Sequence, residues 1–509
     1  MGIFRRLFSN NRNAGVRAAK PNRNIGRRNV SGSLADNVDY VGQALYDTDD
    51  LVHRPIDGLS AQASLLYLDS ACDAGKIHEL ILKPLLRRKG DIDPDRVLTA
   101  ANFMKLDDLE RAIDLMIRGY AVLFLADRQV CHAIQVAMVN NRSVEEPANE
   151  KTVQGPHDGF IESLHVNLQL VRKQIGSRNL VVKRYRLGKM TKADAAVVYL
   201  NDLADPEVVG EVERRLQAID ADNLMNGLMV LEYLEERSFS PFPQILPTER
   251  PDRVVGNLLE GRVALLMEGT PATLVMPGNF FAFYQSPDDY GSRSLAGSFI
   301  RLLRLFSFFI AISLPAYYIA VVSFHYEVIP MELLYQIKGS VEKIPYPPIL
   351  EAFFMELTIE LLREAGMRLP SPVGQSIGIV GGLVIGDAVV RVGLVSYPMI
   401  IVVALTAIAS FVVPSHEMSY SVRLLRFPVM IAASLFGFVG IAFGLAWIFM
   451  HLCKLESFGK PYFAPISPMR IKDWKDAIVR FPFWMLNERP SDPEPQKRVQ
   501  ERTMKEERP

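Results

Sequence analysis

The spacing of apolar residues divides the chain into two regions that meet near residue 298. Before that point, apolar positions recur every three or four residues or alternate with polar ones, and no uncharged run is long enough to cross a bilayer. After it, long apolar runs follow one another closely. The pattern predicts an α+β membrane protein, with a soluble N-terminal α/β region followed by a mostly α-helical transmembrane domain.

Within the soluble region, a polar stretch at 140–155 separates two expected α/β subdomains. Helical spacing favours helices, and short apolar runs bounded by polar residues favour strands. The expected helices are 76–88, 106–118 and 207–219, and the expected strands are 121–125, 179–185, 195–200, 263–267 and 273–276. The last two strands are expected to form a hairpin shortly before the membrane.

About four apolar segments are expected to cross the membrane. They are 305–324, 377–390, 397–413 and 428–453. Basic residues precede the first segment and follow the last one, so both ends are expected on the cytoplasmic side, which requires an even number of spans. A fifth span at 350–369 would bring Arg423 and Arg426 to that side, but it would place the basic C-terminal segment outside.

Composition narrows the class of protein further. The chain has 509 residues, enough for about three domains, and its 57 basic and 57 acidic residues give no net charge, so nothing favours nucleic-acid binding. Its three cysteines are too far apart to indicate a disulfide framework or a cysteine zinc site. The expected organisation is a disordered basic arm at 1–35, cytoplasmic subdomains at 36–140 and 155–290 (the second with a connector), a transmembrane domain at 298–455, a cytoplasmic juxtamembrane segment at 456–490 and a disordered tail at 491–509.

The basic arm carries eight Arg or Lys residues and no acidic residue. Such an arm is attracted to anionic lipid headgroups, at about 1 kcal/mol per basic residue near the surface. It could equally be a solvated tail that only favours retention on the cytoplasmic side. Both interpretations stay open.

Sequence signals of an enzyme are absent. The chain has no Walker A sequence, no Gly-x-Gly-x-x-Gly after a strand and no His-Glu-x-x-His. His157 and His165 are the only close pair of histidines in the soluble region, and their spacing of eight residues is weak support for a metal site. We therefore expect no enzymatic activity, no cofactor and no metal.

A row of acidic residues is the first candidate for a role in ion movement. Glu356, Glu360 and Glu364 recur every four residues, so on a helix they form one ridge. If several subunits surround an axis, that ridge becomes a stack of acidic rings, which select cations in channels. The alternative is the wet face of an interfacial helix, paired with Arg363 and Arg368.

A second candidate is the pair Asp387 and Arg391, which are four residues apart and can pair on one helix face. A lone Asp in hydrocarbon costs about 2.5–3.5 kcal/mol, so pairing or access to water is expected. The pair is either a pore or gate element or an ion pair where a helix leaves the membrane.

The string 248–252 is the candidate for coupling between domains. Glu249, Arg250 and Asp252 could form a salt-bridge network that links neighbouring parts of the protein. Arg363 is a further coupling candidate. No substrate chemistry is evident in any of these residues, and structural coupling is the default interpretation.

Several strings along the chain occur in a fixed order. They are Gly155-Pro-His-Asp-Gly-Phe160, Ser240-Pro-Phe-Pro-Gln-Ile-Leu-Pro-Thr-Glu-Arg-Pro-Asp252, Leu259-Glu-Gly-Arg-Val263, Glu268-Gly-Thr-Pro271, Arg363-Glu-Ala-Gly-Met-Arg-Leu-Pro370, Gly378-Ile-Val-Gly-Gly-Leu-Val-Ile-Gly386 and Arg423-Leu-Leu-Arg-Phe427. Together they resemble the strings of the GerA family, the A subunits of spore nutrient-germinant receptors. With several motifs of five or more residues, the resemblance is specific.

The resemblance implies a multi-pass protein of the spore inner membrane whose N-terminal region faces the spore core. It implies a transporter-like B subunit that binds the nutrient, a lipoprotein C subunit, and an A subunit that forms homo-oligomers and opens as a nutrient-gated cation channel to trigger germination. The alternative is a non-conducting membrane scaffold, or a paralogue encoded in a sporulation operon that promotes germination without sensing a nutrient.

Two departures from the family's strings bear on these roles. His157 and Asp158 stand where the family has Arg and Glu, and Asp387 stands where it commonly has Gln. A channel lined at the latter point by a neutral amide would differ from one lined by an ion pair.

Overall fold

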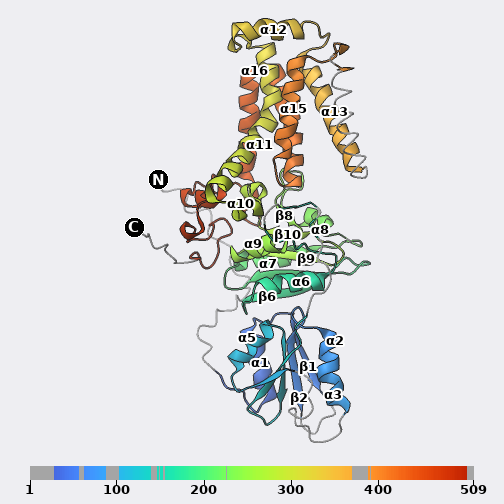
Figure 1. Ribbon diagram of the computed structural model, residues 1–509, viewed down its shortest axis with the longest axis vertical. Helices are drawn as coiled ribbons and strands as arrows, with labels where there is room; N and C mark the ends of the chain where they lie inside the picture. Colours follow the sequence, from blue (N-terminus) through green and yellow to red (C-terminus); the bar gives the residue numbers. More distant parts are fainter. Residues whose placement is uncertain are drawn as a thin grey trace, which may run out of the picture. The chain divides into compact units, whose positions relative to one another are not determined.

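The computed structural model describes residues 28–56, 62–87, 102–138, 146–147, 149–152, 155–224, 226–368, 388–389 and 391–500. They form two compact units (Figure 1). The first unit extends to Ala137, except for Thr48–Asp50, and the second unit consists of Thr48–Asp50 and everything from Met138 onward.

The first unit is an antiparallel five-stranded sheet with helices on both faces. The strands are β1 (Leu51–Ile56), β2 (Ala63–Leu68), β4 (Tyr120–Leu125), β5 (Cys131–Gln135) and β3 (Phe103–Leu106), in that spatial order. Helices α1 (Leu34–Ala44) and α5 (Leu109–Ile117) share a core with one face, and α2 (Ala74–Ile77), the π-helix η1 (His78–Leu82) and α3 (Lys83–Arg87) share a core with the other.

The sequence pattern explains these layers. In β4, Val122 and Phe124 enter one core while Leu123 enters the other, as the two-residue period of a strand requires. In α5, the buried residues are spaced three or four apart, and the side chain of Asp108 caps the helix by accepting from the backbone N–H of Glu110 at 2.9 Å.

The second unit contains another antiparallel five-stranded sheet. Its strands are β6 (Leu180–Leu187), β7 (Ala193–Leu200), β9 (Val263–Met267), β10 (Thr273–Met276) and β8 (Leu246–Thr248), in that spatial order. Helices α6 (Leu164–Gln174) and α9 (Pro251–Leu259) pack on one face, and α7 (Pro206–Ala218) and α8 (Gly227–Leu234) pack on the other. The expected hairpin of 263–267 and 273–276 is confirmed as β9 and β10.

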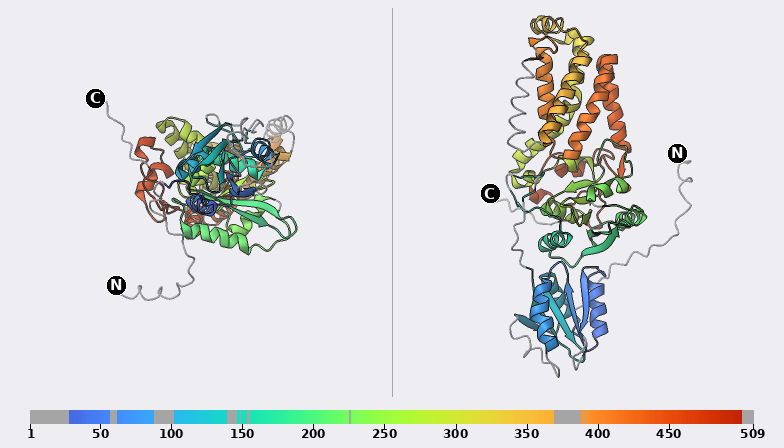
Figure 2. Two further views of the ribbon diagram at one scale, coloured as in Figure 1. Left: turned by 90° about the horizontal axis from the view of Figure 1, so that it is seen from below. Right: turned by 90° about the vertical axis from the view of Figure 1, so that its right-hand side faces the viewer.

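The helical region follows the sheet of the second unit directly. It contains α10 (Pro287–Gly291), α11 (Ser294–Ser323), the 3-10 helix η3 (Tyr326–Val328), α12 (Met331–Val341), α13 (Pro348–Arg368), α15 (Tyr397–Phe411) and α16 (His416–Lys454). Helices α11, α13, α15 and α16 run alongside one another (Figures 1 and 2). One hydrophobic cluster joins them to the α6 and α9 face of the sheet, so this sheet and the helices share a core.

Helix α16 is a hairpin of two arms. Gly437 has φ 59° and ψ −134°, which is not helical. A Cβ on Gly440 would lie 1.9 Å from the carbonyl oxygen of Ala432, although eight residues of straight helix span about 12 Å. The chain therefore reverses at Gly437, and two arms, 416–436 and 438–454, lie against each other. This differs from the single span expected at 428–453, because an apolar run does not reveal a reversal within it.

Two of the described helices, α11 and α16, are long and apolar enough to cross a membrane, and α15 is a shorter apolar helix. Helix α11 contains all but the last residue of the expected span 305–324, and α15 matches most of 397–413. The expected span 377–390 lies outside the described residues except for 388–389. Helix α13 occupies the region considered for a fifth span. The helical C-terminal region is thus established, while the number of four spans stays a prediction.

The C-terminal segment packs against the second unit. It contains β11 (Glu456–Ser457), β12 (Lys460–Pro461), the 3-10 helices η4 (Ile471–Asp473) and η5 (Phe483–Met485), and α17 (Trp474–Ala477). Residues 491–500, for which the sequence indicates disorder, make defined contacts: Asp492 is buried and pairs with Arg262 beside β9. The Pro-rich, charged composition of this segment indicates disorder, because composition does not show that individual charges have buried partners.

Candidate functional site

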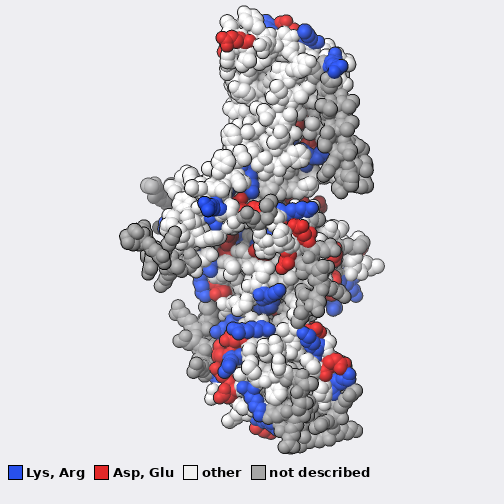
Figure 3. Space-filling view, in the orientation of Figure 1, with Lys and Arg blue, Asp and Glu red and all other residues white. Residues whose placement is uncertain are grey.

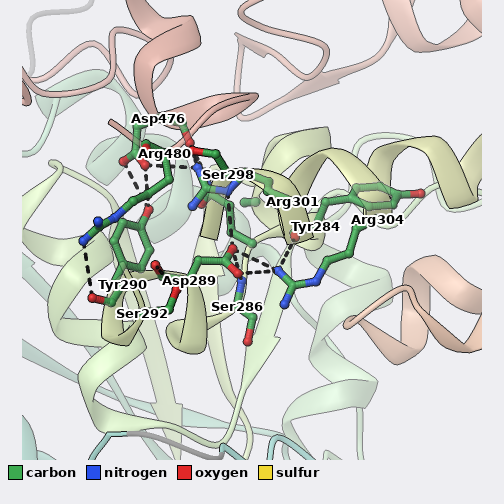
Figure 4. A network of polar contacts seen from close by, with 12 residues as sticks. Tyr284, Ser286, Asp289, Tyr290, Ser292, Ser298, Arg301, Arg304, Asp476 and Arg480 are labelled. Atoms are coloured by element: carbon green, nitrogen blue, oxygen red, sulfur yellow. Dashed lines mark hydrogen bonds and ion pairs between the residues drawn. The ribbon is translucent and has the colours of Figure 1, made fainter. Parts of the chain in front are cut away.

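A buried cluster of charged side chains joins α10 to the start of α11 (Figure 4). A capping box places Asp289 at its centre, because the carboxylate accepts from the backbone N–H of Ser286 at 3.2 Å. Arg304 Nη1 donates to the two Asp289 oxygens at 2.7 and 2.9 Å, and Arg301 Nε donates to Oδ2 at 3.3 Å. The two arginines are three residues apart, so α11 presents both on one side.

The same cluster holds the C-terminal segment. Arg301 Nη1 donates to Asp476 Oδ1 at 3.1 Å, the hydroxyl of Tyr290 donates to the same oxygen at 3.0 Å, and Ser298 Oγ donates to the carbonyl of Arg480 at 2.9 Å. Burial, reinforced by Asp476, raises the pKa of Tyr290 well above its usual value, so Tyr290 remains a donor. Two carboxylates thus balance two guanidinium groups in a buried setting.

Arg253 on α9 extends these contacts back toward the start of the unit. Its Nη1 donates to Glu150 Oε1 at 2.5 Å, and its Nη2 donates to the carbonyls of Ala282 at 2.8 Å and Gln285 at 3.3 Å. Those carbonyls belong to or follow the 3-10 helix η2 (Phe280–Tyr284), which leads into α10. A continuous set of polar contacts therefore runs from residue 150 to the base of α11.

Three of the predicted coupling residues lie together beside Arg253. Arg250 is fully buried, pairs with Asp252 at 2.8 Å and donates from Nη2 to the carbonyl of Pro156 at 2.8 Å. Glu249 Oε1 accepts from Asn149 Nδ2 at 2.6 Å. These residues fasten residues 149–152 and 155–156 to the start of α9. Arg363, the fourth predicted coupling residue, lies instead on α13.

The loop after α8 contacts both arms of α16. Ser240 Oγ lies 2.8 Å from His451 Nε2 on the second arm, and the Phe242 ring stacks on His451 with centroids 6.0 Å apart. Ser421 Oγ on the first arm donates to the carbonyl of Pro241. Contacts from one loop to both arms agree with the reversal at Gly437 and connect the sheet of the second unit to α16.

Inside the helical region, Glu356 pairs with Arg426 and both side chains are buried. Arg426 Nε also donates to the carbonyl of Ala311 on α11 at 2.8 Å. Pro315 stands four residues after Ala311 and has no N–H, so the Ala311 carbonyl lacks its helical donor. The guanidinium of Arg426 replaces that donor and links α11, α13 and α16.

The other two glutamates of the predicted ridge also have arginine partners. Glu360 pairs with Arg423 on α16 at 2.5 Å and with Arg363 at 3.3 Å. Glu364 pairs with Arg368 at 2.6 Å, and both of these side chains are exposed. The ridge therefore changes from a buried interhelical pair at Glu356 to an exposed pair within α13 at Glu364.

The predicted pair of Asp387 and Arg391 is only half described. Asp387 lies outside the described residues, and Arg391 is exposed near the start of the segment that leads to α15. The structure therefore adds nothing to the proposed pairing, which stays a prediction.

Sequence reasoning anticipated the pairs that Arg363 and Arg368 form with the ridge, but it missed the partners that come from other helices. Arg423 and Arg426 entered only as topological charges and as part of a family string, and Arg301 and Arg304 only among the basic residues before the first span. A signal was present: arginines three residues apart inside or beside apolar runs are costly unless they have partners. The partner Asp476 is about 175 residues away in the sequence and could not be identified from spacing.

A cavity of about 710 Å³ adjoins the cluster, with Arg253, Tyr290 and Asp476 in its lining. Glu260 also lines it, and burial raises the pKa of this carboxyl to about 7 although Arg262 lies 3.5 Å away and opposes the shift. Among the residues that the structure describes, no group of three or more His, Cys, Asp or Glu side chains is placed to hold a metal ion.

Comparison with known proteins bears on the whole chain. The family model described as Bacillus/Clostridium GerA spore germination protein matches residues 39–492. Spore germination protein B1 of Bacillus subtilis is 39% identical over 93% of this chain and 100% of its own length. Spore germination protein KA of Bacillus subtilis is 37% identical over 91% of this chain and 87% of its own length. Spore germination protein GerLA of Bacillus cereus is 35% identical over 91% of this chain and 96% of its own length.

Among solved structures, the N-terminal domain of the A subunit of the Bacillus megaterium spore germinant receptor GerK3 aligns with a TM-score of 0.40 and 24% identity, covering 50% of this chain and 98% of that one. The family match over most of the chain and the extent of these sequence relatives agree with the resemblance of the ordered strings. This chain belongs to the GerA family of spore germination proteins.

Proposed function

We propose that this chain is the A subunit of a nutrient germinant receptor and that several copies form a nutrient-gated cation channel in the spore inner membrane. In this proposal the chain crosses the membrane several times and its N-terminal region faces the spore core. A transporter-like B subunit binds the nutrient, and a lipoprotein C subunit completes the receptor. Membership in the GerA family supports the receptor role, and the apolar helices α11 and α16 support the membrane location.

The observation that carries the channel proposal is the row of glutamates on α13 opposite arginines of α16. Arg423 and Arg426 lie on the apolar helix α16, where charged side chains are costly, so we infer that they and their glutamate partners have a function beyond packing. In the described arrangement, Arg426 and Arg423 neutralise Glu356 and Glu360. Moving α13 away from α16 would uncover these carboxylates, and uncovered rings of carboxylates favour cations.

Asp387 and Arg391 form a second part of the proposal. Their spacing supports an ion pair that closes the path, so losing either charge should shift the gate in opposite senses. Asp387→Asn leaves a positive charge and should slow potassium release, whereas Arg391→Ala leaves a negative charge and should make release premature. If both variants release potassium at the same rate as the parent, Asp387 and Arg391 are not part of the gate.

The contacts that end at α11 provide a route for the signal. Glu249, Arg250 and Asp252 hold residues 149–152 and 155–156 on α9, and Arg253 connects α9 to the segment before α10. A displacement of the soluble sheet would therefore reach the base of α11 through defined polar contacts rather than through a flexible connector.

Potassium release from purified spores tests the channel. Glu360→Gln keeps the size of the side chain but removes its charge, so nutrient-triggered release should slow when normalised to subunit abundance. Glu332→Gln on α12, which also removes one charge from an exposed position, should behave like the parent. Normal release in each of Glu356→Gln, Glu360→Gln and Glu364→Gln would exclude this row from the cation path.

A non-conducting scaffold, or a sporulation-operon paralogue that does not sense nutrient, is the second candidate. It is favoured by the fact that each glutamate of the row already has an arginine partner within one chain. Receptor of A, B and C subunits reconstituted in potassium-loaded liposomes separates the two, because only a channel releases potassium when the nutrient is added. Neighbouring genes for a transporter-like subunit and a lipoprotein would favour the receptor.

A further inference from the structure

The first turns of α11 and the C-terminal segment 466–484 carry exposed apolar side chains at the same end of the helical region. We propose that together they form a lipid-contact surface that rests in the headgroup layer of an anionic bilayer. This surface is defined by the exposed residues of 295–306 and 466–484. The inference does not depend on whether the protein conducts ions.

Helix α11 is longer than a membrane span. Its 30 residues extend about 45 Å, whereas the hydrocarbon core is about 30 Å thick. About ten residues therefore lie outside the hydrocarbon, and the buried Arg301 places them at the start of the helix. Yet Leu295, Phe299 and Leu303 are exposed there, Phe299 by 68%. An exposed apolar face at the end of a spanning helix is suited to the interface between lipid and water.

The C-terminal segment has the composition of a membrane interface. Its exposed apolar side chains are Met469, Ile471, Trp474, Phe483 and Trp484, of which Ile471 is 68% exposed. Lys472 and Lys475 alternate with them and are exposed as well. Tryptophan and lysine gather where protein meets headgroups, since an indole is amphipathic and lysine is attracted to anionic lipid.

Acidic residues in this segment do not cancel its positive charge toward the bilayer. Asp473 accepts from the backbone N–H of Ser491 at 3.3 Å, and Asp476 is held by Arg301 and Tyr290 in the buried cluster. Both carboxylates thus have partners in the protein, whereas Lys472 and Lys475, which border the cavity beside α9, remain exposed and can attract anionic headgroups.

Defined contacts hold the two parts side by side. Ser298 Oγ donates to the carbonyl of Arg480 at 2.9 Å, and the rings of Tyr290 and Phe483 stack with centroids 6.2 Å apart. Where Figure 1 draws the start of α11 and the C-terminal segment, the face in Figure 3 is mainly white with a few blue residues. Continuity with the spanning part of α11 favours lipid over a protein partner, because membrane insertion of that helix brings this surface to the bilayer.

The chain contains three tryptophans, so fluorescence can report on this surface selectively. The full chain carrying Trp447→Phe retains only Trp474 and Trp484, and is placed in nanodiscs with anionic phosphatidylglycerol. Lipids brominated near the headgroup end of the acyl chain should quench its emission more than lipids brominated near the chain end. Emission that neither lipid quenches would overturn the proposal. In that case, quenching by the water-soluble acrylamide would show that the tryptophans face water, and its absence would show that protein covers them.

Matched variants test whether the quenching comes from contact between this surface and lipid or only from the general closeness of the protein to the bilayer. Ile471→Glu should reduce the quenching, whereas Met190→Glu, an exposed methionine in the turn after β6, should not. Lys472→Glu with Lys475→Glu should remove the extra quenching that anionic lipid produces, whereas Lys338→Glu on α12 should not. Protein with Trp447 alone, in the second arm of α16, serves as the control for deep quenching. Equal effects of the surface and control variants would contradict the assignment.

Discussion

Arg426 makes two contacts inside the helical region, and each one satisfies a different buried polar group. It neutralises the buried carboxylate of Glu356, and it supplies the donor that Pro315 removes from the carbonyl of Ala311. A buried ion pair is weak support for stability in itself, because desolvation offsets its attraction. Its effect on stability appears when one partner is removed and the other is left buried and unpaired.

We therefore expect Arg426→Ala to lower the free energy of unfolding by about 3–5 kcal/mol, since it leaves both Glu356 and the Ala311 carbonyl without a donor. The double variant Arg426→Leu with Glu356→Leu removes both charges and should be milder. Thermal unfolding of the purified protein in detergent measures the difference.

Arg368→Ala is the matched control, because it breaks an exposed pair with Glu364 on α13. Exposed pairs contribute about 0–1 kcal/mol, so this variant should unfold close to the parent. An Arg426→Ala protein as stable as Arg368→Ala would show that the buried pair does not hold the three helices together.

Glu260 makes stability depend on pH in a defined direction. Burial raises the pKa of its carboxyl from 4.5 to about 7. The folded protein therefore favours the protonated form, so this contribution to stability is complete below pH ~4.5 and is lost as pH rises through 7. With 28% of the side chain exposed, we expect a loss of about 1–2 kcal/mol.

Glu260→Gln should consequently raise the unfolding temperature relative to the parent at pH 8 and have little effect at pH 4.5. The exposed residue Glu488 lines the same cavity, so Glu488→Gln is the control. It should leave the unfolding temperature unchanged at both pH values. Identical pH profiles for Glu260→Gln and the parent would show that this carboxyl is not protonated in the folded protein at neutral pH.

At the level of the elements, periodicity predicted best those parts with a single, strong pattern. The amphipathic α5 and α7 and the buried strands β4, β6, β7, β9 and β10 lie where the spacing of apolar residues places them. Strand β1 was missed, since it contains His53, Arg54 and Pro55 and is half exposed. The candidate site was predicted in part: the ridge glutamates and their local partners Arg363 and Arg368 were found. Asp289, Asp476 and the partners on α16 were not, because spacing alone does not bring distant segments together.

The reversal within α16 was also beyond sequence reasoning, and it has a direct topological consequence. A straight helix of 39 residues would place its two ends on opposite sides of a membrane, whereas two antiparallel arms place them on the same side. Small residues permit this close packing, because Gly440 leaves no Cβ between the arms.

We predict that Cys453, which is exposed, and a cysteine introduced by Ser415→Cys react with a membrane-impermeant maleimide from the same side of sealed vesicles. Cys72 and Cys131 are buried and should react only after unfolding. Each site is measured separately, with Cys453→Ser as the background for Ser415→Cys. Labelling of the two sites from opposite sides would exclude the hairpin.

At the scale of the second unit, the polar contacts form one continuous series from the sheet to the helices. The series begins at Glu150, crosses Arg253 to the segment before α10, and ends where Asp289 holds Arg301 and Arg304 of α11. Because Asp476 joins the same cluster, the C-terminal segment is tied to this junction as well. Because these side chains are buried and paired, we expect the junction to pass a displacement of the sheet on to α11.

Asp289→Asn tests this series of contacts at the single residue that holds both arginines of α11. The amide can still accept a hydrogen bond from one arginine but cannot neutralise two, so Arg301 and Arg304 would retain only the charge of Asp476. Removing one partner of such a buried set costs about 3–5 kcal/mol at the junction, which should loosen α11 from α10 without touching the glutamates of α13. Nutrient-triggered potassium release from purified spores, normalised to subunit abundance, should slow by about tenfold or more, because the opening movement is no longer passed on.

Asp289→Glu, which restores the charge, should recover part of the rate, and Asp220→Asn, which breaks an exposed pair with Lys189, should leave it unchanged. Normal release from Asp289→Asn spores at normal subunit abundance would show that the signal reaches the helices by another route.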